Sequence, residues 1–244
     1  MGKTIRFKSQ EDHQDFLRDF CKTHPLSKLH SSGHVILNYV RKKYDFSHAI
    51  YTLLKEKKLI ERDALSQLSA LEDLHTITDP ALTTLDDSEL NQMSRCFYES
   101  SDDFLDIYRR FMDQVVAPLV GEPIYYQKTP TVRFQFPNQK GYNWVERLHT
   151  DIMLGHPPEE YNIWVPLTTV SGTNSMLLSP VKDSMTAYRS CNFDFELLAQ
   201  RVQYDSGFVN SIRRSAVPIE LDPGQFITFD PHCLHGTQSN DTPS

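Results

Sequence analysis

The sequence predicts an α+β protein in which a mainly helical N-terminal part, residues 1–121, precedes a β-rich part, residues 122–244. Before Gly121, apolar residues recur at helical spacing. After it come short runs rich in Val, Ile, Phe, Tyr and Thr, separated by turn residues. Six or more short strands after a helical block favour an antiparallel sandwich or jelly roll supported by helices. We find no repeat and no linker, so we expect one domain over residues 1–244.

The clearest helix of the N-terminal part is expected to begin at Ser101-Asp102-Asp103. A capping residue and two acids suit the positive end of a helix dipole there. Gly121, with Pro123 behind it, should end this helix. Earlier helices are expected at residues 35–58 (one broken helix or two short ones), 60–74 and 89–98.

The β-rich part is punctuated by proline and glycine. The clearest buried strand is expected at residues 161–169. Pro166 within it implies that it is an edge strand or contains a bulge. Asp222-Pro223-Gly224 is typical of a tight turn between strands. Residues 182–214 form an insert, helical near 195–202, whose place in the fold the pattern does not give. Strands are expected at residues 124–128, 131–136, 145–151, 161–169, 175–178, 216–221 and 225–229.

The composition narrows the class of protein. With 25 Lys and Arg against 32 Asp and Glu, the net charge of −7 argues against a general nucleic-acid binder, which needs a basic surface. No apolar run approaches the roughly 20 residues of a transmembrane helix. The charged start of the chain lacks an export signal, and the four cysteines form no CxxC pair. We therefore expect a cytoplasmic protein with free thiols.

The main chemical signal is His149-Thr150-Asp151 together with the distant His235. In a strand, residues two apart point to the same face, so His149 and Asp151 can bind one metal ion from one strand end. A second histidine completes a 2-His-1-carboxylate set, which suits Fe(II) and leaves coordination positions open. Such a triplet alone could also be a surface pair in a loop. Its context favours a site, because both histidines lie at the ends of β-like runs beside loops.

The segments RLHTDIMLGHPPEEYNIWVPLT, NSMLLSP and PGQFITFDPHCLHGTQSN, in this order, resemble the non-haem iron, 2-oxoglutarate-dependent oxygenases. Within these the chain most resembles the phytanoyl-CoA-dioxygenase-like group and its bacterial members from carbohydrate and aminoglycoside biosynthesis clusters. The resemblance covers about residues 124–244. It implies a double-stranded β-helix (a jelly roll), with Fe(II) held by His149, Asp151 and His235 and with 2-oxoglutarate and O₂ as cosubstrates. His235 is preferred over the nearby His232 because Gly236 and the HGTQSN segment match the family.

The resemblance also implies residues that bind 2-oxoglutarate. An arginine a short distance beyond the second histidine pairs with the far carboxylate of 2-oxoglutarate in these enzymes, because its planar fork suits a carboxylate. No arginine follows His235 here, so we expect one further strand carrying it beyond Ser244; otherwise Arg133 or Arg147 serves. Asn162 could hydrogen-bond the iron-side carboxylate, or it could be a polar residue on the outer face of its strand.

The expected function is therefore that of a dioxygenase that hydroxylates a small molecule, for which a sugar or aminocyclitol intermediate is one hypothesis. Two alternatives stay open. A cupin-like metalloenzyme would keep the three ligands without 2-oxoglutarate, and a jelly-roll carbohydrate-binding module would need no iron. Loss of activity on iron chelation separates the enzymes from the module, and dependence on 2-oxoglutarate separates the two enzymes.

Overall fold

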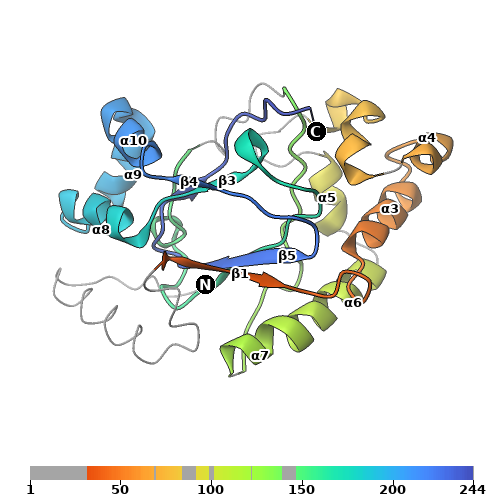
Figure 1. Ribbon diagram of the computed structural model, residues 1–244, viewed down its shortest axis with the longest axis horizontal. Coiled ribbons are helices and arrows are strands. Elements are labelled where there is room, and N and C mark those ends of the chain that lie inside the picture. The colour runs from red at the N-terminus through yellow and green to blue at the C-terminus, as the bar shows by residue number, and fades with distance from the viewer. Residues whose placement is uncertain are drawn as a thin grey trace.

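The computed structural model describes residues 32–68, 70–83, 92–98, 102–121, 123–138 and 147–243. Strands occupy the middle of the molecule (Figure 1). The helices of the N-terminal part lie at one end, and the helices of the insert lie at the other. In the part of the chain that is described, no helix is both long enough and apolar enough to cross a membrane.

The strands form two antiparallel three-stranded sheets. The first has the order β1-β5-β2 and is built from His34–Asn38, Gln225–Phe229 and Asn162–Trp164. The second has the order β4-β3-β6 and is built from Val217–Ile219, Met176–Leu178 and His235–Gly236. Buried residues of both sheets, including Ile227, Phe229, Leu178 and Ile219, share one apolar core, so the sheets pack against each other. The fold is α+β with antiparallel sheets, as predicted.

The prediction of helix from residue 35 onward is wrong for its first part. His34–Asn38 is strand β1, and it pairs along the whole of β5, with Ile36 opposite Ile227. The helix begins only at Phe46, where the Asp45 side chain accepts a hydrogen bond from the backbone N–H of His48. The N-terminal part therefore contributes a strand to the first sheet, because the apolar run His34–Asn38 lies beside a buried partner strand.

The two strands predicted just after Gly121 are also wrong. Residues 123–138 form neither helix nor strand. Individual side-chain contacts hold the segment instead. The Tyr108 hydroxyl donates to the Gln127 carbonyl at 2.9 Å, and Gln135 Nε2 donates to the Gln238 carbonyl at 2.6 Å. Phe134 is buried in the N-terminal core. Aromatic and β-branched residues thus serve packing here without a ladder of backbone hydrogen bonds.

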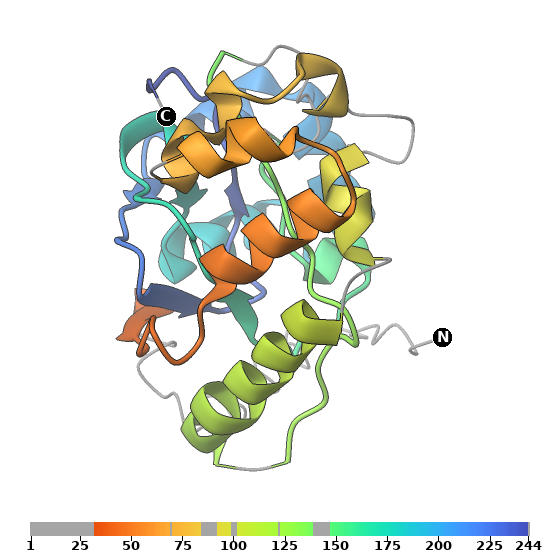
Figure 2. The same ribbon diagram turned by 90° about the vertical axis from the view of Figure 1, so that its right-hand side faces the viewer.

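The N-terminal helices, which face the viewer in Figure 2, enclose a large aromatic core. Gly121 ends the last helix in the left-handed conformation with φ of 77°, as its position predicted. Ser101 lies outside the described residues, and the predicted helix 60–74 is broken into two pieces. The helices are α3 (Phe46–Glu56), α4 (Arg62–Gln67), α5 (Gln92–Tyr98), α6 (Asp102–Phe111) and α7 (Ala117–Val120). Two 3₁₀ turns (Leu71–Thr76 and Pro80–Thr83) and one π turn (Met112–Val116) complete this part.

The insert is more helical than predicted. It forms α8 (Val181–Ser190), α9 (Phe195–Tyr204) and α10 (Ser206–Arg213). The carboxylates of Asp194 and Asp205 cap α9 and α10 by accepting backbone N–H groups. These helices share a second apolar core with Leu148 and Leu234, the residues directly before His149 and His235. The predicted β part therefore also contains three helices.

The predicted turn at Asp222-Pro223-Gly224 is confirmed. The backbone N–H of Gln225 donates to the Asp222 carbonyl at 3.0 Å, and Gly224 has a φ of 101°. The turn leads from β4 to β5, which belong to different sheets. A chain that changes sheets at a tight turn keeps the two sheets face to face.

Candidate metal centre

Two backbone segments meet at the candidate site. His149 and His235 exchange both backbone hydrogen bonds, each at 2.8 Å, as an isolated antiparallel bridge. The neighbouring Gly236 permits this approach, because a Cβ atom there would lie 2.8 Å from the Arg147 carbonyl oxygen. Backbone pairing thus brings together two histidines that are far apart in the sequence.

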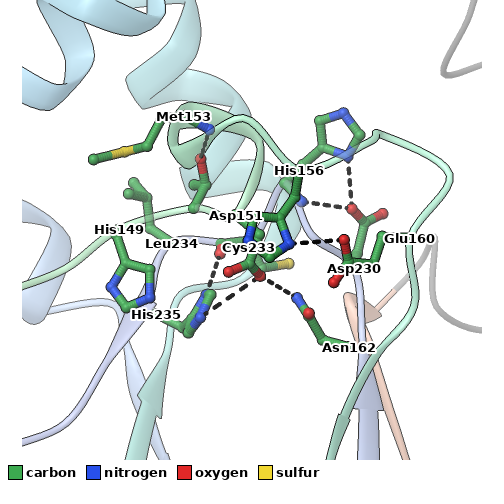
Figure 3. Close-up of polar contacts among 12 residues, drawn as sticks. His149, Asp151, Met153, His156, Glu160, Asn162, Asp230, Cys233, Leu234 and His235 are labelled. Atoms are coloured by element: carbon green, nitrogen blue, oxygen red, sulfur yellow. Dashed lines mark hydrogen bonds and ion pairs between the residues drawn. The ribbon is translucent and has the colours of Figure 1, made fainter. Parts of the chain in front are cut away.

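The side chains of His149, Asp151 and His235 converge on one point (Figure 3). One possible ligand atom from each lies within 4.8 Å of the others. His235 Nε2 is 3.8 Å from Asp151 Oδ2, and the two imidazole centroids are 4.3 Å apart. Two imidazoles and a carboxylate at this separation could bind one divalent ion, and the set suits iron among other metals.

Each imidazole is held so that the same nitrogen faces the centre. His149 Nδ1 lies 3.0 Å from the carbonyl of Arg147, and His235 Nδ1 lies 3.0 Å from the carbonyl of Cys233. A carbonyl only accepts, so in a neutral ring Nδ1 carries the proton and Nε2 keeps its lone pair. Such an outer hydrogen bond is the usual way in which a metal-binding histidine is oriented.

The electrostatics of the site keep one of these rings neutral. Burial, and next the positive charge that His235 can carry, lower the pKa of His149 to about 4. The charge of Arg133 also contributes to this lowering, so Arg133 acts on the centre although it is exposed. A neutral imidazole at neutral pH has the lone pair that a metal needs.

Asp151 is oriented from two sides. Its carbonyl accepts the backbone N–H groups of Leu154 and His156, each at 3.0 Å, and so begins the 3₁₀ turn Ile152–Leu154. Its carboxylate accepts a hydrogen bond from the Asn162 amide on β2 (Figure 3). Asp151 and His235 are only 9% and 7% exposed. The carboxylate is therefore fixed toward the two imidazoles in a largely buried position.

The remaining predicted residues lie around this group. Asn162 is in direct contact with Asp151; its contact with a cosubstrate stays a prediction. Arg147 has an exposed side chain, and its carbonyl holds His149. His232 contacts Asp230 at 2.8 Å and does not belong to the group. His156 also lies outside the group, and its Nδ1 is 2.8 Å from Glu160 Oε2.

The sequence shows no ligand spacing for the six N-terminal histidines. Three of them lie outside the described residues, namely His13, His24 and His30. The other three do not belong to the candidate metal group, namely His34, His48 and His75.

Sequence reasoning missed two features of the site. It did not foresee that Gly236 is needed for the pairing of the two segments. It also gave no role to Thr150, which is completely buried between two ligands. The alternation of side chains along an extended segment is the signal that would have placed Thr150 on the face opposite the ligands.

Comparison with known proteins agrees with this geometry. A relative from Streptomyces griseus, described as "Streptomycin biosynthesis protein StrG", is 28% identical over 138 residues. The match covers 57% of this chain and 63% of that protein, so it spans less than two thirds of the relative. Residues 62–244, which include all three converging side chains, match the family described as "Phytanoyl-CoA dioxygenase (PhyH)". The chain that builds this His-Asp-His group therefore belongs to the phytanoyl-CoA dioxygenase family, as its motifs indicated.

Proposed function

We propose that this protein is an Fe(II)- and 2-oxoglutarate-dependent dioxygenase that hydroxylates a small molecule. The observation that carries the proposal is the convergence of His149, Asp151 and His235, with both Nδ1 atoms bound to carbonyls. Membership of an oxygenase family supports the same reading. We also propose one oxygenase domain over residues 1–244, with the two packed sheets as the halves of a jelly roll. The cytoplasmic location stays a prediction.

The protein's own residues would perform three tasks. His149 and His235 would offer neutral Nε2 atoms, and Asp151 a carboxylate, on one side of the metal. Asn162 would keep that carboxylate in place through its amide. The low exposure of Asp151 and His235 would limit water at the centre. Fe(II), when bound, supplies with 2-oxoglutarate and O₂ the oxidising power that hydroxylates a C–H bond.

An arginine on a further strand beyond Ser244 stays our first prediction for the cation that pairs with the far carboxylate of 2-oxoglutarate. Within the described residues, Arg133 is our candidate. Its charge acts on His149, and its side chain is exposed. The adjacent Phe134 is anchored in the N-terminal core, which fixes the backbone from which Arg133 extends. Arg147 is the weaker candidate, because it contacts His149 through its backbone carbonyl.

The proposal for the substrate class rests on the relative and not on the geometry. Because the relative is described as a streptomycin biosynthesis protein, we propose that this chain also acts in small-molecule biosynthesis, on a sugar or aminocyclitol intermediate. A panel of such metabolites, screened for succinate formation above the rate without substrate, would identify the compound. A panel in which no metabolite raises succinate formation would count against this substrate class.

Metal titration tests the central proposal. Wild-type protein should bind one Mn(II) or Co(II) in place of Fe(II). Asp151→Ala and His235→Ala should each lower this affinity by about 100-fold or more, because each loses a direct ligand. His156→Ala is the matched control, since it removes a nearby imidazole outside the group. Equal affinity in all four proteins would place the metal elsewhere, whereas no metal binding in the wild type would favour a metal-free binding module.

Titration of 2-oxoglutarate into the metal-loaded protein tests the cosubstrate. Arg133→Ala should weaken binding by about ten- to a hundredfold, as expected for a charge-assisted pair. Arg147→Ala should leave it unchanged. If metal binds but 2-oxoglutarate does not, also in protein extended past Ser244, the cupin-like alternative is favoured.

A further inference from the structure

Helix α8 of the insert lies directly behind both segments that carry the proposed ligands. The residues next to the ligands in sequence, Leu148, Thr150 and Leu234, are at most 1% exposed. Neighbouring residues of an extended segment point to opposite faces, so these three face away from the centre. Leu148 and Leu234 enter the core of the insert.

Two side chains of α8 reach these segments by hydrogen bonds. The Tyr188 hydroxyl donates to Thr150 Oγ1 at 2.8 Å. The backbone N–H of Leu234 donates to Ser184 Oγ at 3.0 Å. Ser184 and Tyr188 are four residues apart, so they lie on one face of the helix, about 6 Å apart along its axis. One rigid turn of helix therefore holds one residue beside each ligand-bearing segment.

The first of these contacts controls the chain between His149 and Asp151. Thr150 Oγ1 also accepts the backbone N–H of Met153 at 3.3 Å, within the turn that Asp151 begins. Tyr188 thus holds the residue that both separates two ligands and closes the turn behind them. Burial raises the pKa of Tyr188, so the phenol keeps its proton and stays a donor.

The second contact controls the position of His235. Leu234 is bound on both sides of its backbone, because its carbonyl also accepts the backbone N–H of Ser179 at 2.8 Å. Ser184, Thr150 and Tyr188 are all completely buried, where no water competes for their hydrogen bonds.

We propose that α8 is a positioning helix that sets the separation of the two ligand-bearing segments through Tyr188 and Ser184. The inference rests on the proposed metal site and gives the insert a role in building it. Neither residue touches the ligands' side chains in the contacts described, so both are positioning residues. Their loss should loosen the geometry without removing a ligand.

The experiment compares Tyr188→Phe, Thr150→Val and Ser184→Ala with the wild type. Tyr44→Phe is the matched control, because it removes a buried tyrosine hydroxyl bonded to Gln114 Oε1 at 3.0 Å, in the N-terminal core. Two properties are measured. The first is the affinity and visible spectrum of bound Co(II). The second is the hydrogen-exchange rate of the His149 and His235 amides in metal-free protein, corrected for global stability.

Loss of a residue that contacts a metal ligand usually lowers metal affinity 10- to 100-fold. Loss of a contact one step further from the metal should therefore lower it by about three- to tenfold. We expect this loss, with an altered Co(II) spectrum and faster exchange of both amides, in the three α8 and Thr150 variants and not in Tyr44→Phe. Tyr188→Phe combined with Thr150→Val should lose no more affinity than Thr150→Val alone, because Thr150→Val already removes the bond from Tyr188 together with the bond from Met153.

Unchanged Co(II) binding and unchanged amide exchange in Tyr188→Phe and Ser184→Ala would overturn the positioning role while leaving the metal site intact. Absence of Co(II) binding in the wild type would instead overturn the proposed function. In that case the exchange rates of the His149 and His235 amides still test the positioning role of α8, because they report the pairing of the two segments in metal-free protein.

Discussion

The helices at the two ends of the molecule both cover the strands, but they support different parts of the site. The insert core contains Leu148 and Leu234, which are adjacent to two proposed metal ligands. The N-terminal core contains Phe134 and has Ile163 packed against it; these are adjacent to Arg133 and Asn162. The insert therefore stands behind the proposed metal ligands, and the N-terminal helices behind the proposed cosubstrate residues.

The two cores also differ in construction. In the N-terminal core, Phe111 makes edge-to-face contacts with four rings, those of Tyr39, Tyr44, Phe46 and Phe226, at centroid distances of 5.4 to 5.7 Å. Phe226 belongs to β5, so this network joins the helices to the first sheet. The insert core is smaller and holds buried hydrogen bonds to the ligand segments. Damage to the first should lower mainly stability, whereas damage to the second should also alter the metal centre.

The largest effect on the centre is expected where neither core acts. Gly236→Ala would place a Cβ atom 2.8 Å from the Arg147 carbonyl oxygen, so the segments of His149 and His235 must separate. We expect metal affinity to fall by about 100-fold or more, as when ligand geometry is lost. Calorimetric titration of Co(II) measures this. Gly155→Ala is the control. Its φ of 94° would strain an alanine, but the added Cβ atom would meet nothing within 4 Å, so no neighbouring segment must move. Wild-type affinity in Gly236→Ala would contradict the close pairing.

The N-terminal core is tested by Phe111→Ala. This residue is 1% exposed, and its removal should lower the free energy of unfolding by about 3–5 kcal/mol, through lost burial and the cavity left behind. Urea unfolding of metal-free protein measures the loss. At low urea, where the protein is still folded, its Co(II) affinity should equal that of the wild type. A large loss of affinity in the folded protein would erase the contrast between the two cores.

The insert core is tested by Leu148→Ala, which should cost about 2–5 kcal/mol of unfolding free energy for the same reasons. Unlike Phe111→Ala, it should also weaken Co(II) binding by about three- to tenfold, because Leu148 precedes His149 and fixes its backbone. Leu198→Ala removes a buried leucine of the same core that is distant in sequence from the ligands, and it serves as the control. Equal affinities in the two variants would show that the core acts on stability alone.

The smallest effect is expected at the surface of the insert. Asp205 caps α10 by accepting the backbone N–H of Phe208 at 2.9 Å and pairs with Arg201. The hydrogen bond from Phe208, and then the contact with Arg201, hold the pKa of Asp205 below its ordinary value. A lowered carboxyl pKa stabilises the folded state above the pKa of the unfolded chain. That stabilisation is lost as the pH falls through the folded pKa.

Asp205→Ala should therefore reduce stability slightly at pH 7, with the difference from wild type shrinking on acidification. Urea midpoints of both proteins at pH 7 and near pH 3 measure this. Co(II) affinity at pH 7 should not change, because the half-buried Asp205 does not belong to the candidate metal group. A difference that grows as the pH falls would contradict the assigned direction of the pKa shift.

Local signals in the sequence predicted several features of this protein. The spacing of His149 and Asp151, the helix end at Gly121 and the turn at Asp222-Pro223-Gly224 each depend on a few adjacent residues. Such features follow from side-chain alternation, from glycine at positive φ and from turn chemistry, all of which act over short distances. The order of the motifs also identified the family.

Only the tertiary structure decided which distant segments these local elements pair with and pack against. Residues 34–38 became a strand because β5 lies beside them, and residues 131–136 did not because their side chains pack into a helical core instead. The approach of His235 to His149 depends on a glycine opposite a backbone carbonyl, and the place of Tyr188 depends on a buried threonine. Pairing and packing partners are set by distant segments, and a pattern read within one segment contains no record of them.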